Sequence, residues 1–224
     1  MEARHNASMA FRPPLPQRLT IAGPAGDLEA IVEDPGVRPV RRCGVVCHPH
    51  PQFGGTMDNK VTHTLARALQ ELGLPTVRFN FRGVGRSRGE FAAGIGETDD
   101  AIAVIDWSLA RWPGAALWLA GFSFGASVAV RACAARPAAV LVTVAPAIQR
   151  LETGPTPGPA TRWLLIQGDQ DELVSYEAVI AWAKQQSVPP RVTLLPGVTH
   201  FFHGSLQEMK AAIFAFVKQE GLAD

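Results

Sequence analysis

The chain has few cysteines and almost no net charge. Its 224 residues include three cysteines, and 21 Lys and Arg residues nearly balance 20 Asp and Glu residues. Without a basic excess, we do not expect nucleic-acid binding through phosphate contacts. Cys43 and Cys47 fall on one expected strand, about 13 Å apart by strand rise, which is too far for a disulfide. A reducing compartment, the cytoplasm, is therefore expected.

Long hydrophobic runs are also missing. The longest apolar runs, residues 115–122 and 138–148, fall short of the roughly 20 residues that a membrane span needs. Residues 1–17 lack the apolar segment of a signal peptide, so we expect a mobile N-terminal tail there. With 47% hydrophobic residues, residues 18–224 are expected to form a single domain with a sizeable core.

Short apolar runs alternate with amphipathic stretches along the rest of the chain. A turn at residues 23–26 predicts a hairpin over residues 18–35. Further strands are expected at residues 43–48, 75–81, 116–122, 138–146, 162–169 and 191–197. Helical spacing is found at residues 59–73, 97–112, 123–136, 176–186 and 205–220. This alternation predicts an α/β fold, with a doubly wound, mostly parallel sheet and an antiparallel N-terminal hairpin.

One serine stands where such a fold places catalytic residues. Ligands of these sheets bind at the carboxyl ends of the strands. Ser123 follows the strand at 116–122 within Gly121-Phe122-Ser123-Phe124-Gly125, which is a G-x-S-x-G motif between a strand and a helix. The sharp turn of a nucleophile elbow would expose the serine hydroxyl. Glycines are needed beside it because a Cβ atom at those positions would collide with nearby backbone. The alternative is a serine that merely caps a buried helix.

A base and an acid follow in the order that this fold uses. A serine hydroxyl needs a base to attack at neutral pH, and the base needs an orienting partner. Asp169 and Asp171 follow the strand at 162–169, and His200 and His203 follow the strand at 191–197. We expect Ser123 to attack, His200 to take its proton, and an aspartate to hold the imidazole. The residues alone leave the choice between the two aspartates open.

Two backbone amides are candidates for an oxyanion hole. Phe124 follows the nucleophile at a helix N-terminus, so its N–H can donate to a developing oxyanion. A second donor is expected from the loop after the strand at 43–48. Pro49 and Pro51 have no N–H to give, so His50 is the best candidate. Each such donor contributes about 3–4 kcal/mol of transition-state stabilisation.

Several blocks taken together resemble one known superfamily. These are HPHPQFGGTMDNK, RFNFRGVGRSRGEF, GIGETDDA, LAGFSFGAS, GDQDELV and HFFHG. They are similar to the α/β-hydrolases, and most of all to small, cap-less serine hydrolases close to the dienelactone hydrolase group. The likeness covers about residues 40 to 205.

The resemblance implies roles for individual residues. It makes Ser123 the nucleophile and His200 the histidine, and its G-x-x-D-x-x-V pattern places the acid on Asp171. The third position of its oxyanion loop falls on His50. Dienelactone hydrolases use a cysteine nucleophile, so their substrate is not carried over to this chain, and Pro49 replaces a glycine of larger lipases.

The expected activity is hydrolysis of a small acyl compound. The connector at residues 147–161 is too short and proline-rich for a helical lid, which favours an open site. We predict a serine hydrolase, carboxylesterase- or thioesterase-like, that needs no cofactor and no metal and acts as a monomer or homodimer. Aromatic residues flanking the catalytic loops are candidates for an acyl pocket, with core packing as the alternative: Phe53, Phe122, Phe124, Phe201 and Phe202.

Two other functions compete with this prediction. A metal-dependent hydrolase would use the polar side chains near one sheet edge, namely His48, His50, Asp169, Asp171, His200 and His203, but it leaves the serine elbow unexplained. His48 and His203 are better interpreted as loop-stabilising residues. A non-catalytic binding protein with the same fold is the other alternative, although no residue of the expected triad is missing.

A glycine-rich segment at residues 83–89 does not match a nucleotide-binding motif. Arg82, which directly precedes this segment, and Arg86 and Arg88 within it are expected to be solvated, or else to attract an anionic group of a substrate. Asn80, which precedes this segment, is expected to satisfy backbone groups of a loop.

Overall fold

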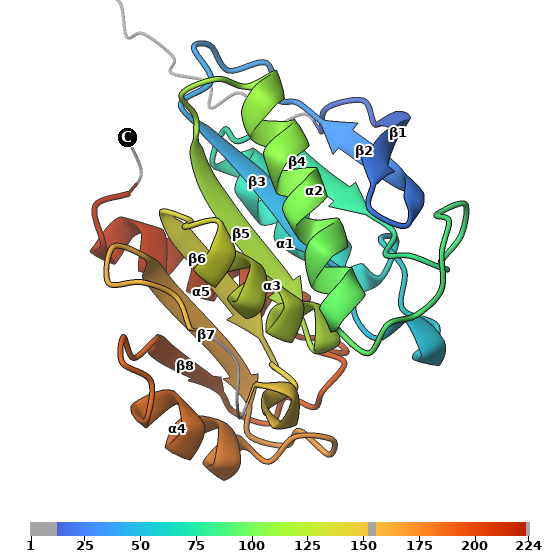
Figure 1. Cartoon of the computed structure of the whole chain (residues 1–224). Helices are drawn as coiled ribbons and strands as arrows, with labels where there is room; N and C mark the ends of the chain where they lie inside the picture. Colours follow the sequence, from blue (N-terminus) through green and yellow to red (C-terminus); the bar gives the residue numbers. More distant parts are fainter. Residues whose placement is uncertain (1–12, 152–155, 223–224) are drawn as a thin grey trace, which may run out of the picture.

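The computed structural model describes residues 13–151 and 156–222. A mixed sheet of eight strands in the order β1-β2-β4-β3-β5-β6-β7-β8 runs through the described residues, with helices on both faces (Figure 1). The strands are β1 (Gln17–Gly23), β2 (Gly26–Glu33), β3 (Arg42–Cys47), β4 (Thr76–Phe79), β5 (Ala116–Phe122), β6 (Val140–Val144), β7 (Arg162–Gly168) and β8 (Arg191–Leu195). The predicted α/β fold class is confirmed.

The hairpin and the remaining strands pair as the sequence pattern predicts. β1 pairs antiparallel with β2, and β2 antiparallel with β4. All other neighbours, from β4 through to β8, are parallel. β5 lies near the middle of the sheet and is buried from Leu117 to Phe122. Its apolar sequence is therefore typical of a parallel strand covered on both faces.

Helices cover the two faces of the sheet in separate groups. They are α1 (Lys60–Glu71), α2 (Ile95–Arg111), α3 (Phe124–Ala135), α4 (Tyr176–Lys184) and α5 (Leu206–Gln219), with short 3-10 turns η1 (Pro51–Phe53) and η2 (Ile148–Arg150). α2, α3 and α4 pack into one hydrophobic cluster, and α1 and α5 into the cluster on the opposite face (Figure 1). No helix in the described part of the chain is long and apolar enough to cross a membrane.

Most element boundaries shift by one or two residues from the sequence-based expectation, and two of these shifts are informative. α2 begins at Ile95 rather than Glu97, because the Glu97 carboxylate accepts hydrogen bonds from the amides of Gly94 and Ala92 and closes the first turn. β1 begins at Gln17, the last residue assigned to the tail. Residues 1–12 of that tail and residues 152–155 of the proline-rich connector lie outside the described residues.

Candidate active site

Ser123 stands on a sharp turn between β5 and α3. Its backbone has φ 54° and ψ −116°, in a region that non-glycine residues rarely adopt. A Cβ added to Gly121 would lie 2.3 Å from the Gly125 carbonyl oxygen, and one added to Gly125 would lie 2.3 Å from the His48 carbonyl oxygen. Both glycines of the motif are therefore needed for close approach of the chain, as the sequence predicts. The hydroxyl makes no helix-capping hydrogen bond, which argues against the capping role.

The three residues of the expected triad come together at the carboxyl ends of their strands. Ser123 Oγ lies 3.0 Å from His200 Nε2, and His200 Nδ1 lies 2.8 Å from Asp171 Oδ2. A carboxylate can only accept, so it fixes the imidazole proton on Nδ1. Nε2 then carries the free lone pair that can accept the serine proton. His200 is 3% exposed, so this chain of hydrogen bonds is largely shielded from water.

Asp171 is held by donors on both carboxylate oxygens. Oδ1 accepts from the amides of Leu173 at 2.9 Å and Val174 at 2.8 Å. Oδ2 accepts from His200 and also from Gln167 Nε2 at 2.8 Å. Burial is the largest single influence and raises the pKa of Asp171, but the hydrogen bonds from His200 and the backbone amides outweigh it and hold the pKa below its usual value. These hydrogen bonds therefore favour the ionised form of the Asp171 carboxylate.

Asp169, the other aspartate that the sequence left open, has a different partner. Its Oδ1 accepts from the amide of Gly197 at 2.6 Å. This contact joins the loop after β7 to the loop after β8 and does not involve the histidine. The geometry thus separates the two aspartates: of the pair, Asp171 alone forms a hydrogen bond with the His200 side chain.

An open cavity of about 370 Å³ lies in front of Ser123 and His200. It is lined by Pro49, His50, Phe53, Gly54, Gly55, Asn59, Phe122, Ser123, Leu173, His200 and Phe201. Phe53 is 85% exposed, and Leu173 and Phe201 are exposed as well. The cavity therefore has an apolar, solvent-facing rim beside the serine.

The structure separates the aromatic residues that the sequence grouped as one pocket. Phe53, Phe122 and Phe201 line the cavity, whereas Phe202 does not. Phe202 is fully buried, belongs to the core on the α1 and α5 face, and packs edge-on against Phe122. Phe124 is also buried, on the opposite face. The adjacent residues Phe201 and Phe202 thus point in different directions, one into the cavity and one into the core. Because both side chains are apolar, the residue type alone does not reveal which of the two lines the cavity.

The two expected oxyanion donors lie beside the serine. His50 lines the cavity, and Phe124 is the first residue of α3. In the part of the chain that the structure describes, neither amide donates to a protein acceptor, so both remain available. The carbonyl of His50 accepts from the amides of Phe53 and Gly55, and this fixes the loop immediately after it.

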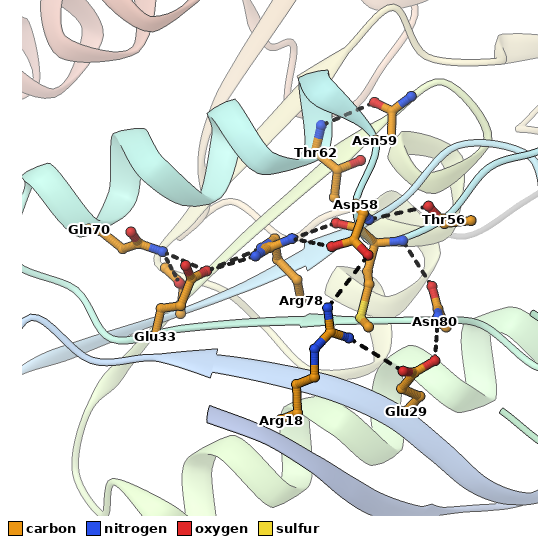
Figure 2. Close-up of polar contacts among 12 residues, drawn as sticks. Arg18, Glu29, Glu33, Thr56, Asp58, Asn59, Thr62, Gln70, Arg78 and Asn80 are labelled. Atoms are coloured by element: carbon orange, nitrogen blue, oxygen red, sulfur yellow. Dashed lines mark hydrogen bonds and ion pairs between the residues drawn. The ribbon is translucent and has the colours of Figure 1, made fainter. Parts of the chain in front are cut away.

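The segment that carries His50 is anchored by buried side chains of β4 and the residue after it. Asn80 Oδ1 accepts from the Met57 amide at 2.9 Å, and Arg78 Nη1 donates to the Met57 carbonyl at 2.7 Å. Arg78 also pairs with Glu33 at 3.0 Å and reaches Asp58 at 3.4 Å. Figure 2 shows these side chains converging around the chain between Thr56 and Asn59. Asn80 thus satisfies loop backbone groups, as expected.

The other end of this segment is held by His48. This side chain is fully buried, its Nε2 accepts from the Phe81 amide at 3.0 Å, and its Nδ1 lies 2.6 Å from the Pro49 carbonyl oxygen. Burial lowers the pKa of His48 to about 3, so the ring is neutral and structural. Among the described residues, no group of three or more His, Cys, Asp or Glu side chains is arranged to hold a metal ion.

The arginines of the glycine-rich loop divide into two environments. Arg82 forms a two-point contact with buried Asp100, at 2.7 Å and 3.0 Å, and so has a structural role. Arg86 and Arg88 are exposed and line a small depression beside β1 and β2. Neither belongs to the cavity at Ser123.

Three polar residues that shape the site were not predicted from the sequence. Arg78 and Gln167 are buried within the apolar strands β4 and β7, and Asn59 caps α1 while lining the cavity. A charged or amide side chain interrupting an apolar strand run is a usable signal, because a buried polar group needs a partner. That signal was present in the sequence at Arg78 and Gln167.

The sheet order, the elbow and the absence of a cap among the described residues define a cap-less α/β-hydrolase. The model of the family described as "Serine aminopeptidase, S33" matches residues 45–163. The chain belongs to this family of α/β-hydrolases, which confirms the resemblance stated from the sequence.

Individual proteins support the same assignment. An uncharacterised protein of Rickettsia prowazekii (strain Madrid E) is 33% identical over 204 residues, which is 85% of this chain and 84% of that protein. An α/β serine hydrolase homologue from Coxiella burnetii is 43% identical, with a TM-score of 0.83 over 91% of this chain and 96% of its own. An α/β serine hydrolase without a lid from Xanthomonas campestris is also 43% identical, with a TM-score of 0.85 over 93% and 96%. The protein is thus a hydrolase of the lidless α/β type.

Proposed function

We propose that the protein is a serine hydrolase that cleaves a small ester, thioester or related acyl bond through an acyl-enzyme. The observation that carries this proposal is the continuous chain from Ser123 Oγ through His200 to Asp171, with contacts of 3.0 Å and 2.8 Å. A neutral imidazole within hydrogen-bond reach of a hydroxyl, and itself oriented by a carboxylate, is the arrangement that activates a serine.

The reaction would proceed in two halves. His200 Nε2 takes the proton as Ser123 Oγ attacks the acyl carbonyl, and the amides of His50 and Phe124 bind the oxyanion. Collapse of the tetrahedral intermediate breaks the bond to the leaving group, which receives the proton from His200. Water then attacks the acyl-enzyme with His200 again as base, releasing the acid and restoring the serine. No cofactor enters these steps.

The shape of the cavity supports a small or protruding substrate. It is open and has an apolar rim formed by Phe53, Leu173 and Phe201. An apolar acyl or leaving group would be partly covered there while its carbonyl reaches Ser123. We further propose a cytoplasmic location, since the three cysteines, Cys43, Cys47 and Cys133, are free and buried.

Labelling with a fluorophosphonate probe tests whether the serine is activated. The expected result is a single adduct by intact mass, mapped to the peptide that contains Ser123, and no adduct on Ser123→Ala. The rate should fall in acid, since a protonated imidazole cannot take the serine proton.

Folded protein that gains no adduct would contradict the proposal and favour a non-catalytic binding role. Ester hydrolysis that stops on adding a chelator, without any serine adduct, would instead indicate the metal-dependent hydrolase. One additional sample that contains a chelator thus distinguishes the non-catalytic binding protein from the metal-dependent hydrolase.

A further inference from the structure

The buried side chain of Gln167 contacts Asp171, the acid of the proposed triad. Gln167, near the end of β7, is fully buried in a strand whose other buried residues are apolar. Its Nε2 donates to Asp171 Oδ2 at 2.8 Å and lies 3.3 Å from the Val174 carbonyl oxygen. One amide group therefore bridges the carboxylate and the backbone of the loop that carries it.

The orientation of this amide is fixed by its neighbours. Turning it over would place Oε1 against two acceptors, the Asp171 carboxylate and the Val174 carbonyl, which is repulsive. In the orientation observed, Oε1 is buried and has no hydrogen-bond partner among the described residues. An unpaired buried carbonyl destabilises a fold, so the fold alone does not explain a glutamine at this position.

The donors on the carboxylate are unevenly distributed without the glutamine. Asp171 Oδ1 has two backbone amides, from Leu173 and Val174. Apart from Gln167, the only donor to Oδ2 within the described residues is His200, whose ring must itself be oriented. Gln167 supplies the second contact that keeps Oδ2 directed at the imidazole.

We propose that Gln167 is a positioning residue, which acts through Asp171: its hydrogen bond orients and stabilises the carboxylate that holds His200. This inference rests on the proposed hydrolase function and extends it to a fourth side chain. Two further acids lie on the same loop. Asp169 accepts from the Gly197 amide and Glu172 from the His200 amide, so neither shares the Gln167 contact.

Gln167→Met tests this role, because methionine has a similar length and no donor. Gln170→Met is the matched control, since Gln170 is exposed on the following loop. Hydrolysis of p-nitrophenyl acetate is followed between about pH 5 and 9, at the isosbestic wavelength of the nitrophenol. Circular dichroism and urea unfolding confirm that both variants fold.

The expected result for Gln167→Met is a fall in kcat of about 10- to 100-fold with KM little changed, the effect of losing a hydrogen bond to a charged group. The acid limb of the pH profile should move to higher pH, since a carboxylate with fewer donors attracts the imidazolium proton more strongly. Gln170→Met should match the wild type in both measurements.

A double-variant cycle separates positioning from packing. In an Asp171→Asn background, Gln167→Met should have little further effect on the rate of fluorophosphonate labelling, because its target carboxylate is gone. An equal loss in both backgrounds, or an unshifted pH profile with unchanged kcat, would overturn the role of Gln167. Failure of the wild-type protein to label at all would instead contradict the proposed hydrolase function, so the two failures are distinguishable.

Discussion

At the residue scale, the site depends on the strained backbone of Ser123 and on the hydrogen bonds made by the residues around it. Ser123 is held at positive φ by its neighbours, since its amide donates to the Val144 carbonyl and its own carbonyl accepts from the amides of Ala126, Ser127 and Ala147. These bonds offset the cost of an unfavourable backbone conformation, of order 1–3 kcal/mol. The strain therefore serves to present the hydroxyl to His200.

Replacement of the two neighbouring aspartates by asparagine should have very different effects. In Asp171→Asn, the side-chain amide offers His200 Nδ1 a donor or a weaker acceptor, so the histidine is no longer held in the required tautomer. We expect kcat to fall by about 10⁴-fold. Asp169→Asn keeps an oxygen that can accept from Gly197, and its activity should stay near the wild-type value. Steady-state ester hydrolysis measures both, and the reverse order would assign the acid to Asp169.

At the element scale, the loop from His48 to Asn59 is positioned by β4. Arg78 and Glu33 form a buried ion pair, with side chains 3% and 8% exposed, and Gln70 also donates to Glu33. Together with Asn80, this network holds both backbone groups of Met57. More than half of the residues lining the cavity come from this loop, so its position determines the shape of the site.

Removing one partner of the buried pair should destabilise the fold strongly. Arg78→Met leaves the Glu33 carboxylate buried with Gln70 as its one remaining donor within the described residues, and we expect a loss of about 3–5 kcal/mol in the free energy of unfolding. Arg78→Met combined with Glu33→Gln should recover part of this loss, because no unpaired charge remains. Urea unfolding measures both changes.

An exposed ion pair provides the control for this prediction. Arg136 pairs with Asp106 on the surface, with side chains 44% and 48% exposed. Arg136→Met should leave the unfolding midpoint nearly unchanged, since surface pairs contribute little. Equal losses in Arg78→Met and Arg136→Met would show that burial is not what makes the first pair important.

The order of elements could be predicted from the sequence because each strand and helix has its own local pattern. Apolar runs such as residues 116–122 and the helical spacing of α1 are local signals. The placement of β4 between β2 and β3 depends on contacts between distant segments, and no local pattern encodes it. The early start of α2 was missed because glycines at 94 and 96 suggested a loop, whereas Glu97 closes the turn.

Part of the candidate site could also be predicted from the sequence. Ser123 and His200 were predicted because each follows a strand, and the fold brings such positions to one edge. The same reasoning left Asp169 and Asp171 open, and only the family resemblance favoured Asp171. The separation of Phe201 from Phe202, and the contacts of Arg78 and Gln167, were not predicted. They depend on which way a side chain points once the loop is packed, and Phe202 has a backbone φ of 53° that sequence spacing does not reveal.

At the scale of the whole molecule, buried neutral histidine should make the fold sensitive to acid. The folded pKa of His48 is about 3, lowered by burial from 6.5. The unfolded chain therefore binds a proton as pH falls below about 6.5, whereas the folded protein does not until about pH 3. Stability is greatest above pH 6.5 and is lost in this window, by up to about 1.4 kcal/mol for each pH unit.

Urea unfolding at several pH values between about 7 and 4 measures this loss. His48→Gln keeps an acceptor near the Phe81 amide without a titrating ring, so its stability should fall less steeply with acid than that of the wild type. Burial also lowers the pKa of His50 and His63, so part of the slope should remain. The lowered pKa of Asp171 acts in the same direction only below about pH 3.8. Identical slopes for the variant and the wild type would contradict the assignment to His48.

Covalent acylation of Ser123 during turnover is the step on which the proposed function depends most directly. Rapid acid quenching of the protein with p-nitrophenyl acetate, followed by intact mass and peptide mapping, measures this directly. We predict a burst of nitrophenol and one acetyl group on Ser123, and neither in Ser123→Ala. Turnover with no acetyl group on Ser123, and with Ser123→Ala as active as the wild type, would contradict the proposed acyl-enzyme mechanism.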